Sequence, residues 1–171
     1  GSRSPVRAAR PAGAARAALG LPAERRIVLV PARLHPMKGH VDLLAAVTIV
    51  RRRVPDVLVL CAGDGPLRDV LPALSASAGL GDCVRWLGQR DDMPVLLGAA
   101  DVVALASHVE GLPAAIMEAF AAERAVVATA VGGVPEVVRD GETGWLAPAR
   151  GPHALAAGLP DALLDRPGRA E

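Results

Sequence analysis

Tyrosine and asparagine are absent from this chain, and aromatic residues make up only 2% of it. Stacking on bases therefore cannot be its main mode of action, and N-glycosylation is excluded. No apolar run reaches the ~18 residues that a transmembrane segment requires. The two cysteines, Cys61 and Cys83, are too few for a disulfide scaffold or a structural zinc site. We expect both to be buried thiols, and we expect no metal site.

The chain also has no large excess of charge of either sign, since its formal net charge is +1. A nucleic-acid binder would need a strong basic surplus, so no nucleic-acid partner is expected. Hydrophobic residues make up 51% of the 171 residues, which indicates a packed core. At about 150 residues per domain, this length predicts one domain. We place it at residues 25–165, between an N-terminal extension or linker at 1–24 and a tail at 166–171.

Apolar, β-branched runs alternate with helical patterns along this domain. The strands are expected to be buried on both faces, which is typical of a parallel sheet covered by helices. We therefore predict an α/β fold with a Rossmann-like, doubly wound parallel sheet of about six strands, whose ligands bind at the carboxyl ends of the strands. The expected strands are 27–30, 57–62, 84–87, 102–105, 125–129 and 143–147, and the expected helices are 41–53, 67–78, 92–100, 113–122 and a weaker 153–164. A further short helix is expected within residues 4–20.

The loop after the first expected strand carries Arg33, Lys38 and Gly39. Lys38 is the only lysine in the chain, and it stands where a strand turns into a helix. A phosphate site can use the planar fork of Arg33 together with the point charge of Lys38, and Gly39 permits close backbone approach. The alternative is a solvated loop with two unrelated cations.

The loop after the fourth expected strand carries Glu110, Gly111 and Leu112, and Glu118 lies two turns into the next helix. Free amides at that helix N-terminus can bind an anion. Carboxylates accept hydrogen bonds from vicinal hydroxyls, so Glu110 and Glu118 suit a sugar and a ribose. Alternatively, Glu110 is an ordinary charge at a helix start and Glu118 a solvated helix position.

Three other loop features are weaker. The glycine-rich turn at 62–66 is not a dinucleotide fingerprint, because Arg68 stands where the third glycine should be. Gln89 and the backbone around it could hydrogen-bond a base edge. Ser107 beside His108 suggests a nucleophile, but no G-x-S-x-G elbow surrounds the serine and no orienting aspartate is evident.

Taken together, the loops resemble the donor-binding, C-terminal half of group 1 glycosyltransferases (family 4, GT-B fold). Glu110 and Glu118 match the family's E-x7-E pair, with seven residues between them. The other matching segments are 32–34 with Lys38 and Gly39, 62–66, 86–88, 100–102, 107–113, 116–119, 131–138 and 140–144. The match covers roughly residues 17–165. It departs from the family pattern at residues 122–125, where a small residue, glycine and proline are usual, and this puts the end of the preceding helix in doubt.

The resemblance implies a role for each matching residue. Arg33, Lys38 and Glu110 would be catalytic, with the two cations on the donor diphosphate and the carboxylate facing the donor sugar. The donor-binding set would be Arg33, Lys38, Gly39, Gln89, Arg90, Glu110, Gly111, Leu112 and Glu118. Within it, residues 89–90 flank the base, 111–112 offer backbone N–H groups, and Glu118 binds the ribose.

The resemblance also implies an activity. Family members transfer a sugar from a nucleoside-diphosphate sugar with retention of configuration, need no catalytic metal or cofactor, and serve in polysaccharide biosynthesis. The partner expected here is the nucleoside-diphosphate sugar, together with a missing N-terminal acceptor domain, without which the chain would be inactive. Gly1 and Ser2 look like the scar of a cleaved expression tag, which fits a piece of a longer protein. We expect a cytoplasmic protein, with peripheral membrane attachment through the missing domain as an option.

Two other functions remain open from the sequence. One is a non-catalytic nucleotide-binding module that uses the same pocket without transfer. The other is half of a sugar-nucleotide epimerase, which shares the two-domain architecture. The E-x7-E pair with Arg33 and Lys38 favours transfer over epimerisation.

Overall fold

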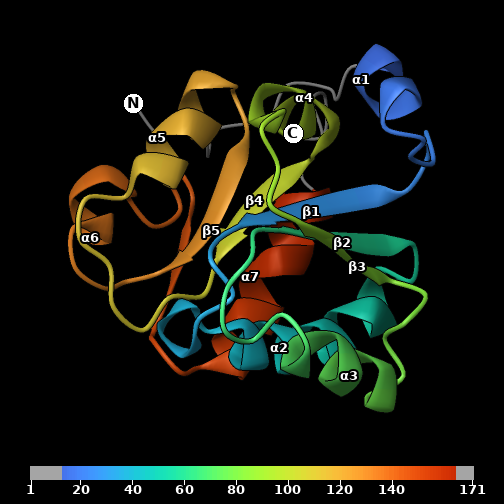
Figure 1. Ribbon diagram of the computed structural model, residues 1–171. Coiled ribbons are helices and arrows are strands. Elements are labelled where there is room, and N and C mark those ends of the chain that lie inside the picture. Colours follow the sequence, from blue (N-terminus) through green and yellow to red (C-terminus); the bar gives the residue numbers. More distant parts are fainter. Residues whose placement is uncertain (1–12, 165–171) are drawn as a thin grey trace.

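A fully parallel sheet of six strands runs through the centre of the computed structural model, which describes residues 13–164 (Figure 1). Its spatial order is β3-β2-β1-β4-β5-β6, the order of a doubly wound dinucleotide-binding sheet. The strands are β1 (Arg26–Pro31), β2 (Val57–Ala62), β3 (Val84–Gly88), β4 (Val102–Leu105), β5 (Ala125–Thr129) and β6 (Trp145–Ala147). The predicted fold class is confirmed.

Helices cover both faces of the sheet. In Figure 1, α2, α3 and α7 lie below the sheet, while α1, α4 and α5 lie above it. The helices are α1 (Gly13–Ala18), α2 (His40–Arg53), α3 (Val70–Ser77), α4 (Met93–Ala99), α5 (Ala114–Ala121), α6 (Val134–Val137) and α7 (Pro152–Leu164), and a 3-10 turn, η1 (Pro36–Lys38), precedes α2. The chain thus covers one face through the helix after β1 and the other through the helix after β4.

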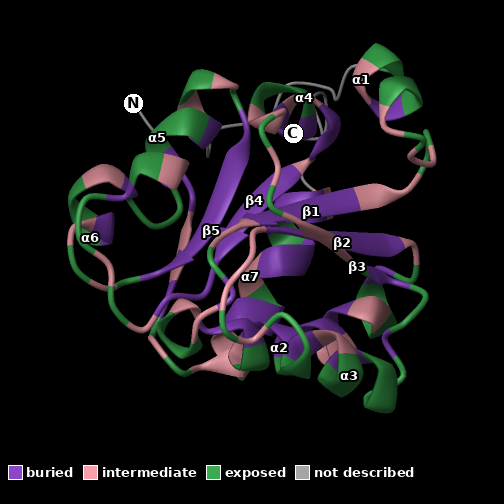
Figure 2. Ribbon diagram, viewed as in Figure 1, coloured by how far each residue is buried: buried purple, intermediate pink, exposed green. Residues whose placement is uncertain are grey.

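Successive strand residues pack into different cores, as the pleat of a strand requires. In β1, Val28 and Val30 pack into the core under α2 and α7, whereas Ile27 and Leu29 pack into the core under α4 and α5. Figure 2 shows the strands as buried and the outer helix faces as mostly exposed. Burial on both faces explains why these strands read as continuous apolar runs.

Both cysteines are buried and free, as expected. Burial raises the pKa of Cys61 to about 12 and also raises the pKa of Cys83. Neither thiol is therefore activated as a nucleophile.

The last helix is longer and more regular than its sequence suggests. α7 continues through Gly158 and Pro160 to Leu164, although proline removes one helical hydrogen bond. Its residues Leu155 and Leu159 are completely or almost completely buried. Packing against α2 and β5 therefore overrides the weak local helix preference.

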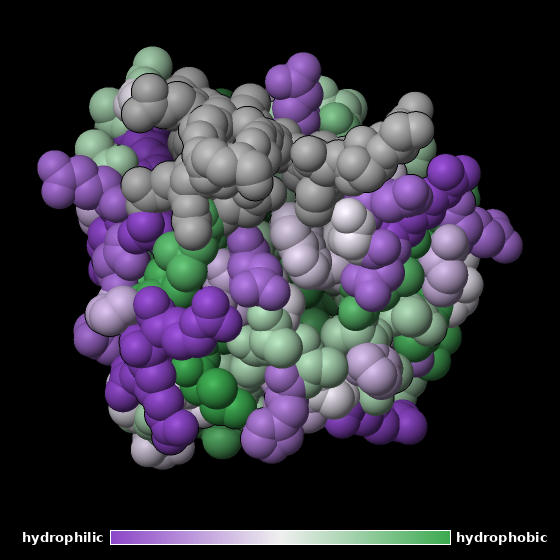
Figure 3. All heavy atoms as spheres, turned by 180° about the vertical axis from the view of Figure 1, so that it is seen from behind, coloured by the Kyte–Doolittle hydropathy of each residue, from purple (hydrophilic) through white to green (hydrophobic). Residues whose placement is uncertain are grey.

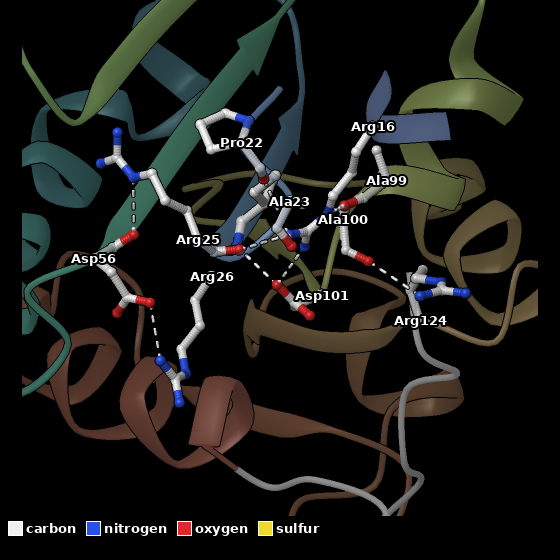
Figure 4. Close-up of polar contacts among 11 residues, drawn as sticks. Arg16, Pro22, Ala23, Arg25, Arg26, Asp56, Ala99, Ala100, Asp101 and Arg124 are labelled. Atoms are coloured by element: carbon white, nitrogen blue, oxygen red, sulfur yellow. Dashed lines mark hydrogen bonds and ion pairs between the residues drawn. The ribbon is translucent and has the colours of Figure 1, made fainter. Parts of the chain in front are cut away.

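The chain before β1 packs against the domain. Arg16 of α1 is buried, and its guanidinium donates to the Ala99 carbonyl oxygen and to Asp101 Oδ2, each at 3.0 Å (Figure 4). Asp101 Oδ2 also accepts from the Ile27 backbone N–H at 2.8 Å. The described part of the expected extension, residues 13–24, is thus tied to the amino ends of β1 and β4. The earlier part of the helix expected within 4–20 lies outside the described residues.

The end of α5, which the sequence put in doubt, is formed without glycine. The helix ends at Ala121, and Glu123 follows in the left-handed region with φ 58°. Arg124 then donates to the carbonyl oxygen of Ala122 at 2.9 Å and to that of Ala100 at 3.1 Å. Figure 4 shows the second of these contacts. A glutamate and a buried arginine thus take the places where the family usually has glycine and proline.

Apolar and polar side chains both lie at the surface. The face seen from behind shows hydrophilic and hydrophobic residues interspersed (Figure 3). Leu112, at 86% exposure, and Val109, at 61%, protrude from the loop after β4. Within residues 13–164, no helix has the length and hydropathy that crossing a membrane demands.

Candidate functional site

The carboxyl ends of β1 and β4 define the place where a ligand is expected. These strands are neighbours in the sheet, yet the helices that follow them cover opposite faces. This place is the switch point of a doubly wound sheet, where such sheets bind their ligands. The loop after β1 carries Lys38 and the loop after β4 carries Glu110.

Lys38 and Glu110 meet at this switch point. The Lys38 ammonium lies 3.3 Å from Glu110 Oε1 and 3.2 Å from Oε2. Both side chains are largely shielded, with exposed fractions of 27% and 14%. The only lysine of the chain thus contacts the carboxylate that the sequence singled out, in a setting where charge-assisted contacts are strong.

Two buried hydroxyl groups form a chain of hydrogen bonds that ends at Glu110. Ser107 Oγ donates to Glu110 Oε2 at 2.9 Å, and Thr129 Oγ1 donates to the Ser107 carbonyl oxygen at 2.6 Å. Ser107 and Thr129 are each 1% exposed. Sequence reasoning missed this arrangement because Thr129 ends a different strand, β5, and Ser107 was considered only as a nucleophile.

An aspartate does orient His108, contrary to the expectation from sequence. His108 Nε2 lies 2.7 Å from Asp42 Oδ2 in the first turn of α2, and the His108 backbone N–H donates to the Met37 carbonyl oxygen at 2.8 Å. The Ser107 hydroxyl, however, is directed to Glu110 and not to the imidazole. The rejection of a serine nucleophile therefore stands on geometry, since no Ser-His-Asp relay forms.

Two glycines allow the loops of the site to touch. Gly39 has φ 70°, and a Cβ there would lie 1.8 Å from the Ala106 carbonyl oxygen. Gly132, after β5, has φ 54°, and a Cβ there would lie 1.7 Å from the Glu110 carbonyl oxygen. A side chain at Gly39 would push apart the loops that hold Lys38 and Glu110, and one at Gly132 would push the loop after β5 away from Glu110.

The turn before α2 places Lys38 beside a buried histidine. His35 caps η1 by accepting the Met37 N–H at 3.1 Å, and Gly39 ends it in the left-handed region. His40 is then the first residue of α2, only 2% exposed, with its ring tilted against Trp86. Burial, together with the Lys38 charge, lowers the pKa of His40 to about 4. The imidazole is therefore neutral near pH 7.

The remaining predicted residues lie on loops and on α5, and within residues 13–164 none of their side chains forms a hydrogen bond or ion pair with Lys38 or Glu110. Gly111, Leu112 and Glu118 are exposed, the last beside the buried Ile116 and Ala119 of α5. Arg33 and Gln89 are exposed in the loops after β1 and β3.

Arg90, like Lys38, is paired with a carboxylate, in this case one from its own loop. Its guanidinium pairs with Asp92 at 2.6 Å and 2.9 Å, and that hydrogen bond lowers the pKa of Asp92 and raises the pKa of Arg90. Residues 13–164 contain no cluster of three or more His, Cys, Asp or Glu that could hold a metal ion.

Comparison with known protein families gives a match over most of the chain. Residues 13–171 match the family described as "Glycosyl transferases group 1". The chain belongs to this family. The resemblance drawn from the loop motifs is confirmed, and the chain is a group 1 glycosyltransferase domain.

Glycosyltransferases are among the relatives and solved structures to which this chain is similar. The chain is 40% identical, over 171 aligned residues, to the D-inositol 3-phosphate glycosyltransferase of Mycolicibacterium vanbaalenii, covering 90% of this chain and 37% of that protein. It superimposes with a TM-score of 0.81 and 30% identity on Anabaena HepE, solved with UDP and glucose, covering 90% of this chain and 44% of that one. With a TM-score of 0.80 and 26% identity it also matches the C-terminal domain of a group 1 family protein, LpcC, from Francisella tularensis, covering 94% and 86%. The chain thus spans less than half of the first two proteins and most of the isolated domain.

Proposed function

We propose that this chain is the donor-binding domain of a retaining, family 4 glycosyltransferase that takes its sugar from a nucleoside-diphosphate sugar. The observation that carries the proposal is the meeting of Lys38 and Glu110 at the switch point between β1 and β4. A cation for phosphate and a carboxylate for hydroxyl groups stand together where this sheet type binds nucleotides. The structure of HepE with UDP and glucose supports the same ligand class.

In this proposal, Arg33 and Lys38 neutralise the charge that develops on the leaving diphosphate. Fixed cations aimed at developing charge lower the barrier without a metal ion. Arg33 is exposed and the Lys38 ammonium is partly so, so both can turn to a ligand at the switch point. Gly39 contributes the close backbone approach that brings Lys38 next to the loop after β4.

The other contacts follow from position. Glu110 accepts hydrogen bonds from the donor sugar, and the backbone N–H groups of Gly111 and Leu112 face phosphate or sugar. Glu118, two turns along α5, accepts from the ribose hydroxyls. Gln89 and Arg90 flank the base, with the Arg90 side chain held by Asp92.

We propose further that a second domain supplies the acceptor site. The chain covers 37% of the mycobacterial relative's length, which leaves room for a whole domain. With one wall of the cleft, the isolated chain binds its donor but lacks acceptor positioning and exclusion of water, so it transfers nothing.

A thermal-shift panel tests the proposal directly. The chain is melted with UDP, GDP or ADP, with each corresponding sugar nucleotide, and with the free nucleosides. A ligand at about 100 times its Kd stabilises the folded state by ~2.7 kcal/mol, so one base should raise the melting temperature by several degrees. If no nucleoside diphosphate or sugar nucleotide stabilises the chain at millimolar concentration, the proposed function is wrong.

A further inference from the structure

The two oxygens of the Glu110 carboxylate have different surroundings. Oε2 accepts from Ser107 Oγ at 2.9 Å and from the Lys38 ammonium at 3.2 Å. Within the described part of the chain, Oε1 has only the Lys38 ammonium, at 3.3 Å. A carboxylate oxygen has about two lone-pair sites, so Oε2 is filled and Oε1 keeps one free.

Ser107 has little freedom to do anything else. Its side chain is buried, and its carbonyl oxygen accepts from Thr129 Oγ1 at 2.6 Å. A serine hydroxyl carries a single donor hydrogen, and here that hydrogen is given to Glu110. The position of Glu110 Oε2 is thus tied through Ser107 to the carboxyl ends of β4 and β5.

The main chain of Glu110 is held as well. Its carbonyl oxygen lies against Gly132, where no side chain would fit. With the backbone fixed by Gly132 and one oxygen fixed by Ser107, the carboxylate keeps one orientation even if Lys38 moves away. In the proposed function Lys38 does move, because the donor diphosphate attracts its ammonium.

We infer that Ser107 is a positioning residue that holds Glu110 Oε2 and leaves Oε1 to accept a hydroxyl of the donor sugar. The inference rests on the proposed function for the identity of the ligand. Ser107 orients the carboxylate, and with it the Lys38 contact, in the ligand-free chain. It becomes the main side-chain contact of Glu110 when Lys38 has turned to the diphosphate. Loss of the Ser107 hydroxyl should therefore weaken the binding of the sugar nucleotide and not that of the nucleoside diphosphate.

The first experiment needs no ligand, because Lys38 contacts Glu110 in the ligand-free chain. Lys38 is also the only lysine in the chain. Labelling lysine with 13C gives one side-chain Cε signal, which reports the contact with Glu110. In Ser107→Ala that signal should shift toward its position in Glu110→Gln, and Ser107→Thr should restore it. Ser77→Ala is the matched control, because the Ser77 hydroxyl donates to the Leu74 carbonyl oxygen on exposed α3. An unchanged signal in a folded Ser107→Ala variant would overturn the inference.

The second experiment measures binding by calorimetry with UDP and UDP-glucose, and with GDP and GDP-mannose as a second pair. Ser107→Ala should lower the affinity for the sugar nucleotide by about fivefold to tenfold, the effect of one lost hydrogen bond. The affinity for the nucleoside diphosphate should stay within about twofold of that of the unaltered chain. Should Ser107→Ala fold poorly, Ser107→Thr takes its place, with sugar-nucleotide binding near that of the unaltered chain.

A double-mutant cycle separates positioning from a general structural effect. In a Glu110→Gln background, Ser107→Ala should have no further effect on the sugar nucleotide, whereas independent effects would add. Additive losses, or equal losses for UDP and UDP-glucose, would overturn the assignment of Oε1 to the sugar. If the lysine signal shifts as expected but neither ligand pair binds, the positioning of Glu110 is supported and the proposed function has failed.

Discussion

The Lys38 ammonium lies 3.2 Å from Glu110 Oε2, although the two residues are 72 positions apart in the sequence. The contact joins the loop after β1 to the loop after β4 at the switch point of the sheet. In the proposed function, the donor takes Lys38 away from Glu110, so the two residues are coupled and their variants should respond differently to different ligands.

Lys38→Ala should weaken the binding of nucleoside diphosphates far more than the binding of nucleosides, because the ammonium acts on the phosphates. A hydrogen bond to a charged group contributes about 1.5–3 kcal/mol, which is a loss of roughly tenfold to a hundredfold in affinity. Calorimetry with UDP and uridine, or with the base that the thermal-shift panel selects, measures both. Arg52→Ala, an exposed cation near the end of α2, is the control and should change neither. Equal losses for both ligands would mean that Lys38 does not touch phosphate.

Glu110→Gln and Glu118→Gln should differ in which ligand they bind less tightly. Glu110→Gln removes the charge that holds Lys38, so the nucleoside diphosphate should bind as well as before or more tightly, while the sugar nucleotide weakens by ~1–2 kcal/mol. Glu118→Gln should weaken both ligands alike, because both contain the ribose. Calorimetry of each variant with each ligand gives the four values. A Glu110→Gln loss that is as large for the diphosphate as for the sugar nucleotide would contradict the sugar assignment.

Gly132→Ala should destabilise the fold more than Gly141→Ala does. Both glycines have positive φ, 54° and 77°, but only the Gly132 Cβ would meet backbone, the Glu110 carbonyl oxygen at 1.7 Å. The shared backbone strain is about 1–2 kcal/mol, so the excess measures the close approach and should exceed ~1 kcal/mol. Urea unfolding of the two variants gives this difference directly. Equal losses of stability in the two variants would mean that the loop after β4 shifts to accommodate the new Cβ at no cost in free energy.

Acid should weaken the fold through His40. Its folded-state pKa is lowered to about 4 from an ordinary 6.5, so between these values the unfolded chain binds a proton that the folded chain does not. The free energy of unfolding therefore falls as the pH drops through 6.5 toward 4, by up to roughly 3 kcal/mol, and the His40 contribution to the pH dependence fades as the pH rises above 6.5. His40→Phe should flatten this part of the profile, and His153→Phe, at an exposed position, should not. Parallel profiles for His40→Phe and the unaltered chain would assign the slope to other groups.

Glu123→Gly should stabilise the chain, because Glu123 occupies the left-handed region with φ 58° after α5. Glycine adopts this conformation without the steric penalty of a Cβ, and the net gain after its greater unfolded-state entropy should be ~0.5–1 kcal/mol. Ala121→Gly, two residues earlier at the last position of α5, should instead destabilise by about 0.5–1 kcal/mol. Thermal unfolding of both variants decides the sign, and a loss of stability in Glu123→Gly would show that its side chain contributes at this turn.

The sequence by itself determined the elements of the fold. All six strands lie where the apolar runs predicted them, within two residues at their ends. The short helix α6 was expected only as a glycine-rich turn, and α3 begins at Val70 and not at residue 67. These features are local: burial on both faces requires an apolar run, and an amphipathic face requires a 3.6-residue period. The candidate residues Lys38 and Glu110 were also found locally, from a lone lysine and from a carboxylate beside a helix start.

Only the tertiary structure decided which of these residues meet. Strand order brings β1 beside β4, and nothing in either strand specifies that neighbour. Thr129 supports Ser107 from a separate strand, and Asp42 orients His108 from α2. Arg16 joins the chain before β1 to the domain by binding the end of α4. Such polar contacts have no period in the sequence because each pairs two distant segments, and the packing of both cores sets their distances.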